Sequence, residues 1–151
     1  MMTMGKNLSI LIRWLCLPLT MLLCATAQAQ DLAVVVNPLN DVKQLSQSEV
    51  INLYMGRKKK LGQNSVLPLD LIGTNPVKLS FYKHLMDKDL SEINSYWARL
   101  IFSGQGSPPR QMDSIEEIRQ TIRDNLGAIG YVPVNEITED LKVVFRIKAN
   151  Q

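Results

Sequence analysis

Apolar positions follow two spacings along this chain. Continuous runs rich in Val, Ile and Leu predict four strands, over residues 31–37, 66–72, 128–133 and 141–147. Apolar residues spaced three or four apart predict four helices, over residues 47–55, 76–86, 90–102 and 115–126. The order of one strand, a helix, a strand, three helices and two strands predicts an α/β fold with a mostly parallel central sheet flanked by helices.

Capping residues support these helix boundaries. Two serines precede a helix and are followed three residues later by glutamate, which is the spacing of a capping box: Ser46 with Glu49 and Ser114 with Glu117. Asp89 is the expected N-cap of the 90–102 helix, whose apolar face includes Trp97 and Ile101. Gly56 and Gly127 are expected to end the helices before them.

The stretch from Val66 to Leu85 passes from a buried strand into a helix. Asn75 is the expected N-cap and Pro76 the first helical residue, after a turn through Gly73 and Thr74. Free backbone N–H groups and the positive end of the helix dipole favour an anion at such a junction. Thr74 and Asn75 are therefore candidate ligand-binding residues, and the alternative is a capped helix that binds nothing.

A second set of candidates lies in the Gly- and Pro-rich loop from Ser103 to Arg110. Ser103, Gly104 and Arg110 offer a hydroxyl, a close backbone approach and a guanidinium that binds oxyanions, and the alternative is a surface connection. Loops at the carboxyl ends of parallel strands meet at one edge of a sheet. We therefore expect the turn after Asn37 to lie near the junction at residues 73–75.

One dense run of charge, Arg57-Lys58-Lys59-Lys60, follows the first predicted helix. It fits a solvated loop that complements the negative end of that helix. The alternative is a surface that attracts small anions or an acidic partner, screened beyond roughly 10 Å in ordinary salt.

The first 29 residues have the three parts of a secretory signal peptide. Lys6 and Arg13 form its basic region, and an apolar run and the small residues of Ala27-Gln28-Ala29 follow. The apolar run is shorter than the roughly 20 residues of a spanning helix. Leu23 before Cys24 does not fit a lipid attachment site. We expect cleavage before Gln30 and a soluble periplasmic protein without a lipid anchor.

Removing this leader changes the composition. The 151 residues include 17 basic and 14 acidic ones, and the leader takes two basic residues and both cysteines. The remaining 122 residues, 30–151, are enough for one domain, which a core without disulfides must stabilise. Their net charge of +1 makes nucleic acid a poor partner.

Residue constellations for catalysis are absent from the sequence. The only histidine, His84, lies at the edge of an apolar helix face, and there is no nucleophile elbow, phosphate-binding glycine loop or Cys ligand set. Asp87 and Asp89 fit a helix-breaking turn better than a metal site. We expect no enzyme, no cofactor and no metal.

Five stretches in order resemble the substrate-binding proteins of phosphate ABC transporters, within the type 2 periplasmic-binding fold. They are VVVNPLN (34–40), LSQSEVINLYMGRKKKL (45–61), VLPLDLIGTNPVKLSFYKHL (66–85), SYWARLIFSGQGSPPR (95–110) and GAIGYVP (127–133). The resemblance implies a single lobe of a fold that has two. The anion-gripping Arg, Asp and Ser of such proteins fall on Leu71, Gly73 and Asn75, so none is retained.

The resemblance implies an exported, non-enzymatic domain that binds phosphate or another small anion for an ABC transporter. The alternative is a periplasmic interaction or sensory module that docks on a membrane transporter or sensor protein with weak or no ligand binding. A single lobe cannot close over an anion as two lobes do. This favours a binding or sensing accessory protein over a high-affinity transport receptor.

Overall fold

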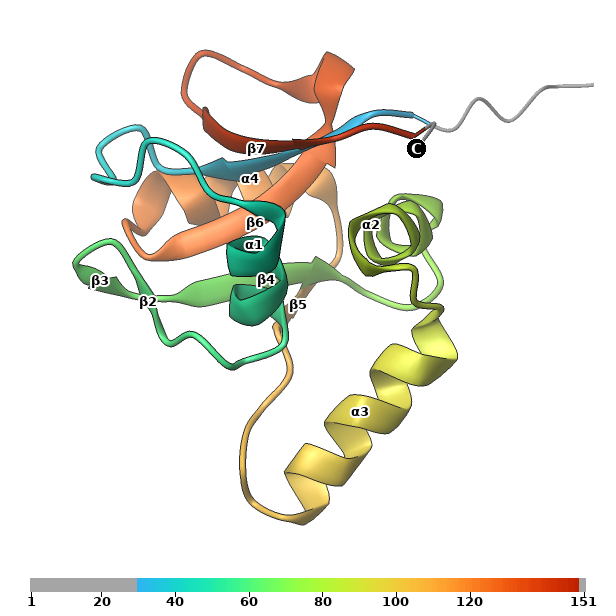
Figure 1. The fold of residues 1–151 in the computed structure, drawn as a ribbon. Coiled ribbons are helices and arrows are strands. Elements are labelled where there is room, and N and C mark those ends of the chain that lie inside the picture. The colour runs from blue at the N-terminus through green and yellow to red at the C-terminus, as the bar shows by residue number, and fades with distance from the viewer. Residues whose placement is uncertain (1–29, 150–151) are drawn as a thin grey trace, which may run out of the picture.

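The computed structural model of the chain describes residues 30–149. The predicted signal peptide, residues 1–29, lies outside the described residues, so its cleavage stays a prediction. Figure 1 shows three layers, with helices on both faces of a sheet.

Five strands form the central sheet in the order β5-β4-β6-β1-β7. β4 runs parallel to both β5 and β6, whereas β1 runs antiparallel to β6 and β7, so four of the five strands share one direction. The prediction of a mostly parallel sheet is therefore confirmed. The strands are β1 (Leu32–Val36), β4 (Leu67–Leu71), β5 (Arg110–Met112), β6 (Ala128–Pro133) and β7 (Lys142–Ile147).

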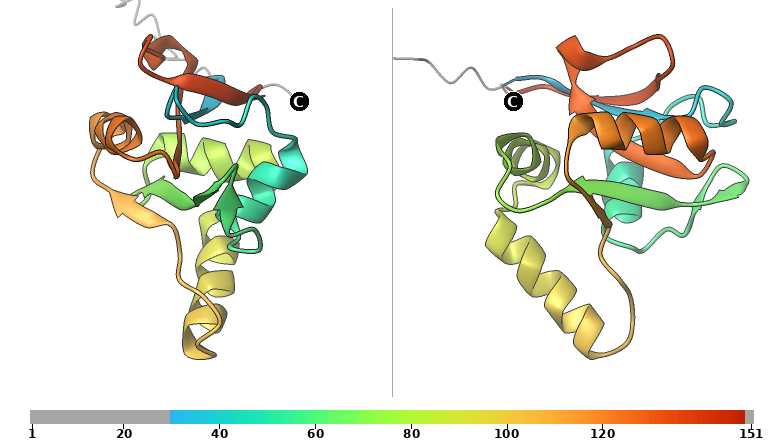
Figure 2. Two further views of the ribbon diagram at one scale, coloured as in Figure 1. Left: turned by 90° about the vertical axis from the view of Figure 1, so that its left-hand side faces the viewer. Right: turned by 180° about the vertical axis from the view of Figure 1, so that it is seen from behind.

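The helices lie on opposite faces of this sheet. α4 (Ile115–Asp124) covers one face, where Ile118 and Ile122 pack closely over Gly130 of β6. α1 (Gln47–Tyr54) and α2 (Pro76–Met86) cover the other face (Figure 2). α3 (Leu90–Phe102) follows α2, a hairpin of β2 (Lys60–Leu61) and β3 (Asn64–Ser65) precedes β4, and a 3₁₀ turn, η1 (Val134–Glu136), follows β6.

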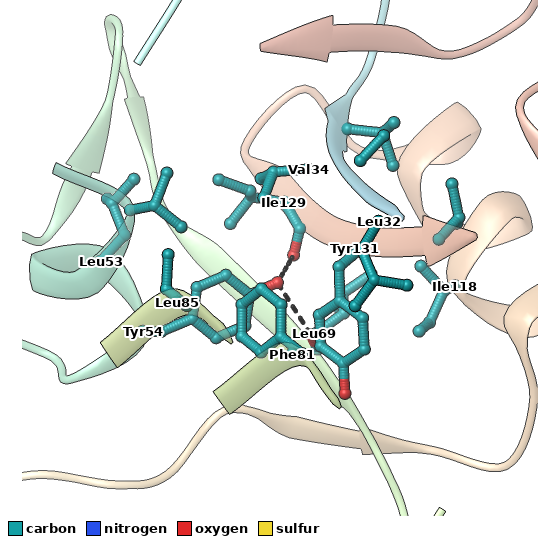
Figure 3. Packing of buried hydrophobic residues seen from close by; sticks show 14 of the residues in the cluster. Leu32, Val34, Leu53, Tyr54, Leu69, Phe81, Leu85, Ile118, Ile129 and Tyr131 are labelled. Carbon is teal, nitrogen blue, oxygen red and sulfur yellow. Dashed lines mark hydrogen bonds between the residues drawn. The ribbon is translucent and has the colours of Figure 1, made fainter. Parts of the chain in front are cut away.

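Aromatic side chains fill the core between the sheet and the α1 and α2 face (Figure 3). The Phe81 ring stacks on the Tyr131 ring with centroids 3.9 Å apart, and Tyr54 packs against Phe81 at 4.7 Å. The Tyr54 hydroxyl donates to the carbonyl oxygens of Leu69 and Ile129 at 3.1 and 3.3 Å. This contact ties α1 to both β4 and β6, the two strands at the centre of the fold.

Most predicted caps are confirmed. Ser46 forms the expected capping box, and Asn75 and Asp89 are the N-caps of α2 and α3. Asp89 also forms a capping box with Glu92, which was not predicted. The box predicted at Ser114 is only half formed, because the Glu117 carboxylate accepts from the backbone of Asp113 instead.

The prediction that Gly127 ends α4 is wrong, since that helix stops at Asp124 with Asn125 as its C-cap. A Cβ at position 127 would lie 2.1 Å from the carbonyl oxygen of Ser65. Glycine is needed there because the chain entering β6 passes directly against the end of β3.

α3 projects away from the sheet (Figure 1), and its buried residues all precede Ala98. Leu90, Ile93 and Trp97 pack inward, whereas Ile101 and Phe102 are 55% and 96% exposed. Ile101 therefore does not belong to the buried face that its spacing predicted, because the helix has already passed the edge of the body. No helix within residues 30–149 is long and apolar enough to cross a membrane.

Candidate functional site

The β4–α2 junction places Thr74 and Asn75 together at the carboxyl end of β4. The Asn75 side chain accepts from the backbone N–H of Val77 at 2.8 Å, and Thr74 is exposed. Pro76, the first residue of α2, has no N–H to offer. Two of the first three helical positions therefore have no free donor for an anion, which weakens this junction as a ligand site.

A buried ion pair lies beneath the junction. The Asp70 carboxylate in β4 is 2.9 Å from the Nζ atom of Lys78 in the first turn of α2, and the two residues are only 2% and 6% exposed. Lys78 also donates to the carbonyl oxygen of Leu71 at 2.8 Å. The cation nearest the junction is thus already satisfied by the protein itself.

Two tyrosines complete this network. The hydroxyls of Tyr82 and Tyr131 donate to Asp70 at 3.0 and 2.6 Å. Burial, and secondly the negative charge of Asp70, raise the pKa of both phenols well above the ordinary value. They therefore remain protonated donors at neutral pH, and the network fastens β4 to α2 and β6.

Sequence reasoning missed this network. The signal was present in Asp70, a carboxylate in an otherwise apolar strand, because a buried carboxylate almost always has a cationic or hydrogen-bonding partner. The partner could not be identified from spacing alone, since Lys78 lies across a turn and on another element.

A cavity at the other end of β4 collects cationic side chains. Its volume is about 290 Å³. Lys58, Lys59, Ser107 and Arg110 supply its polar lining, and we call it the cationic cavity. Its apolar lining includes Leu53, Val66, Leu67, Pro68, Trp97, Pro108 and Pro109.

Local backbone geometry brings these distant segments together. Gly56 turns the chain after α1 with a φ of +69°, and a Cβ there would lie 2.8 Å from the Trp97 ring of α3. The Tyr96 hydroxyl donates to the carbonyl oxygen of Met55 at 2.8 Å. The first residue of the basic run, Arg57, therefore lies next to α3. Pairing of β5 with β4 places Arg110 beside Leu69.

The cations of the cavity are not equally available. Lys58 forms an ion pair of 3.0 Å with Glu49. The backbone N–H of Ser46, then Lys58, lower the pKa of Glu49 to about 2, so this partner stays ionised at neutral pH. Within residues 30–149, neither Lys59 nor Arg110 has an ion-pair partner within 4.0 Å. These two side chains can therefore face an anion.

The predicted ligand residues do not form one site. Arg110 lines the cationic cavity, whereas Thr74 and Asn75 lie beyond the other end of β4, a strand of roughly 13 Å. Ser103 and Gly104 are exposed at the end of α3, where the Ser103 hydroxyl donates to the carbonyl oxygen of Leu100.

The prediction that the turn after Asn37 lies near residues 73–75 is wrong. β1 runs antiparallel to β6, so its carboxyl end is at the opposite edge of the sheet from that of β4. Asn37 instead donates to the carbonyl oxygens of Ile122 and Arg123 at the end of α4.

Among the described residues, no three His, Cys, Asp or Glu side chains gather as metal ligands would.

No family model matches this sequence, and no curated protein is detectably similar to it. Solved structures are similar in fold. An ABC-type phosphate transport receptor from Vibrio cholerae superposes with a TM-score of 0.60 at 16% identity. A putative phosphate ABC transporter substrate-binding protein from Clostridium perfringens, solved with bound phosphate, gives 0.61 at 15%. PstS from Borrelia burgdorferi gives 0.57 at 12%.

These matches cover 76–77% of this chain but only 45–47% of each receptor. The chain thus spans less than half the length of the proteins it resembles, which fits one lobe of a two-lobe fold. The expected resemblance is confirmed at the level of fold: the chain has a fold similar to one lobe of the phosphate ABC transporter receptors.

Proposed function

We propose that this chain is an exported, non-enzymatic, solute-binding-like domain that binds a small oxyanion such as phosphate in the cationic cavity. One observation carries the proposal: cations from two distant segments, Lys58 and Lys59 on one side and Arg110 on the other, line a single cavity. The fold supports it, because the similar structures are phosphate transport receptors.

The size of the cavity and its lining suit this ligand class. A cavity of about 290 Å³ has room for one oxyanion with part of its hydration shell. The Arg110 guanidinium presents paired donors that match two oxygens of a tetrahedral anion, and Lys59 adds a point charge. The apolar wall on the Trp97 side lowers the local dielectric constant, which strengthens both interactions.

Weak affinity is part of the proposal. One lobe leaves the anion partly hydrated, so its charge is screened and less of the interaction energy is realised. A second protein that covers the cavity would tighten binding. A membrane transporter or sensor protein in the periplasm is the partner that we propose for such a complex.

Calorimetric titration with inorganic phosphate tests this function. We expect a dissociation constant of about 0.1 to 1 mM for the chain of residues 30–151. Arg110→Ala and Lys59→Ala should each weaken binding by about three- to tenfold, because each removes one charge-assisted contact. Lys148→Ala, which removes an exposed cation after β7, is the charge-matched control and should have no effect.

Asn75→Ala separates the cavity from the β4–α2 junction. Loss of the N-cap should lower the free energy of unfolding by about 1 kcal/mol and leave phosphate affinity unchanged. If Asn75→Ala abolishes binding while Arg110→Ala does not, the junction is the site and the cavity assignment is wrong. No heat up to millimolar phosphate would reject anion binding altogether.

Export is proposed on the sequence of residues 1–29. Mass spectrometry of the protein recovered from a periplasmic extract should give a chain that begins at Gln30. A chain that retains Met1 in the membrane fraction would contradict both cleavage and the periplasmic location.

An interaction module remains the second candidate function. It is favoured by the basic run Arg57-Lys58-Lys59-Lys60, which fits the surface of an acidic partner. A protein without measurable phosphate affinity but with a defined binding partner would support this candidate.

A further inference from the structure

The C-terminal end of α3 presents two adjacent apolar side chains to solvent. Phe102 is 96% exposed and Ile101 is 55% exposed, and we call this pair the α3 tip. Single exposed apolar residues are common on protein surfaces and need no explanation. The α3 tip differs because the helix carries it well away from the sheet, so that it forms a convex end (Figures 1 and 2).

The surroundings of the α3 tip are strongly basic. Segments 50–69 and 93–112 contain six basic residues and no acidic residue, namely Arg57, Lys58, Lys59, Lys60, Arg99 and Arg110. The two segments lie side by side, because both line the cationic cavity and Tyr96 bonds to Met55 across them. Lys58 is paired with Glu49, but the other five have no ion-pair partner within 4.0 Å among residues 30–149, so this side of the molecule carries net positive charge.

The apolar pair lies on the same side of the molecule as these basic residues. Arg99 lies one turn before Phe102 on the same helix, with its guanidinium 5.8 Å from the Tyr96 ring centre. Trp97, which lines the cationic cavity, precedes Phe102 by five residues, or about 7.5 Å along the helix axis. The cationic cavity and the α3 tip are therefore about one and a half turns of α3 apart.

We propose that the α3 tip and its basic surroundings bind the anionic lipid surface of a membrane, with Phe102 and Ile101 entering the interfacial region. Aromatic side chains partition favourably into that region, and Lys and Arg are attracted to anionic headgroups. The contact is peripheral and reversible, since one helix end supplies it. It needs no phosphate in the cavity, although Lys58, Lys59 and Arg110 contribute charge to both proposed sites.

The shape of the α3 tip favours a membrane over a protein partner. A stable protein interface buries about 800 Å² on each side with complementary shape. Two side chains on a convex helix end offer far less area, whereas a lipid interface needs no complementary shape. The long, flexible Lys and Arg side chains likewise suit a diffuse layer of charge.

Vesicle sedimentation with residues 30–151, the part that contains every described helix and strand, tests the proposal. The protein should pellet with phosphatidylglycerol vesicles, remain in solution with phosphatidylcholine vesicles, and be released by salt. Phe102→Ser should weaken binding about tenfold, as expected for one aromatic side chain leaving the interface. Leu39→Ser is the matched control, because Leu39 is 84% exposed in the turn after β1, and it should bind as the original protein does.

Charge reversal supplies the second arm. Arg99→Glu should reduce the bound fraction at low salt, and Lys148→Glu should reduce it much less. Free phosphate at constant ionic strength separates the two sources of phosphate groups. It should weaken vesicle binding at most slightly if the α3 tip is the contact, because Phe102, Ile101 and Arg99 lie outside the cavity. No pelleting with phosphatidylglycerol at low salt, or equal pelleting of the Phe102→Ser and Leu39→Ser variants, would overturn the proposal. Complete release of the protein from the vesicles by free phosphate would overturn it as well.

Discussion

Replacing Lys78 with methionine should lower the free energy of unfolding by about 3–5 kcal/mol. Methionine has nearly the shape of lysine without its charge, so the change leaves the Asp70 carboxylate buried with no cation beside it. Asp70 would keep the two phenol donors at 2.6 and 3.0 Å, but these neutral groups do not offset the desolvation of a full charge. Urea unfolding followed by circular dichroism measures the loss.

Lys83→Met is the matched control for that experiment. Lys83 is on the same helix and pairs with Asp87, but both side chains are largely exposed, so the loss should stay below about 0.5 kcal/mol. The double variant Asp70→Asn with Lys78→Met should recover part of the loss, because no unpaired charge remains. A single Lys78→Met variant as stable as the Lys83→Met control would show that the buried pair has a different arrangement in solution.

The secondary structure could be predicted well because local signals agree with the final fold. Ser46, Asn75 and Asp89 each cap the helix that their position predicted, since a cap depends only on neighbouring backbone groups. The strand at residues 67–71 and the helix after it follow from apolar spacing and a single turn. These features need no knowledge of distant residues.

The arrangement of the strands could not be predicted in the same way. Nothing within residues 31–37 indicates that β1 pairs antiparallel with both β6 and β7, because pairing direction depends on partners about 100 residues away. This direction separates the turn at Asn37 from the junction at residues 73–75.

The candidate site was predictable in its residue types and not in its grouping. The basic run and Arg110 were each recognisable as anion ligands from sequence, but their common cavity depends on how α3 and β5 return to the body. Ile101 shows the same limit, since its spacing marks a helix face without showing where the body ends. The shared cavity and the exposure of Ile101 both depend on tertiary packing, which the local sequence does not show.

Replacing Phe81 with alanine should lower the free energy of unfolding by about 3–5 kcal/mol, comparable to the Lys78 variant but for a different reason. Phe81 is fully buried between the Tyr54 and Tyr131 rings, so removing its ring opens a cavity that the surrounding strands and helices fill only in part. Alanine favours the helix, so the loss reports packing rather than helix propensity.

Leu79→Ala, two residues away on α2, controls for the helix itself. Leu79 is 43% exposed, so its truncation should cost less than about 1 kcal/mol. Near-ultraviolet circular dichroism should change for Phe81→Ala, because Tyr54 and Tyr131 lose the ring that fixes their orientation, and should be preserved for Leu79→Ala. Equal losses for the two variants would mean that α2 does not present Phe81 to the sheet. The tyrosine rings would then lack the packing that positions their hydroxyls against Asp70 and the β4 backbone. The hydrogen bonds beneath the β4–α2 junction would have to differ from those in this structure.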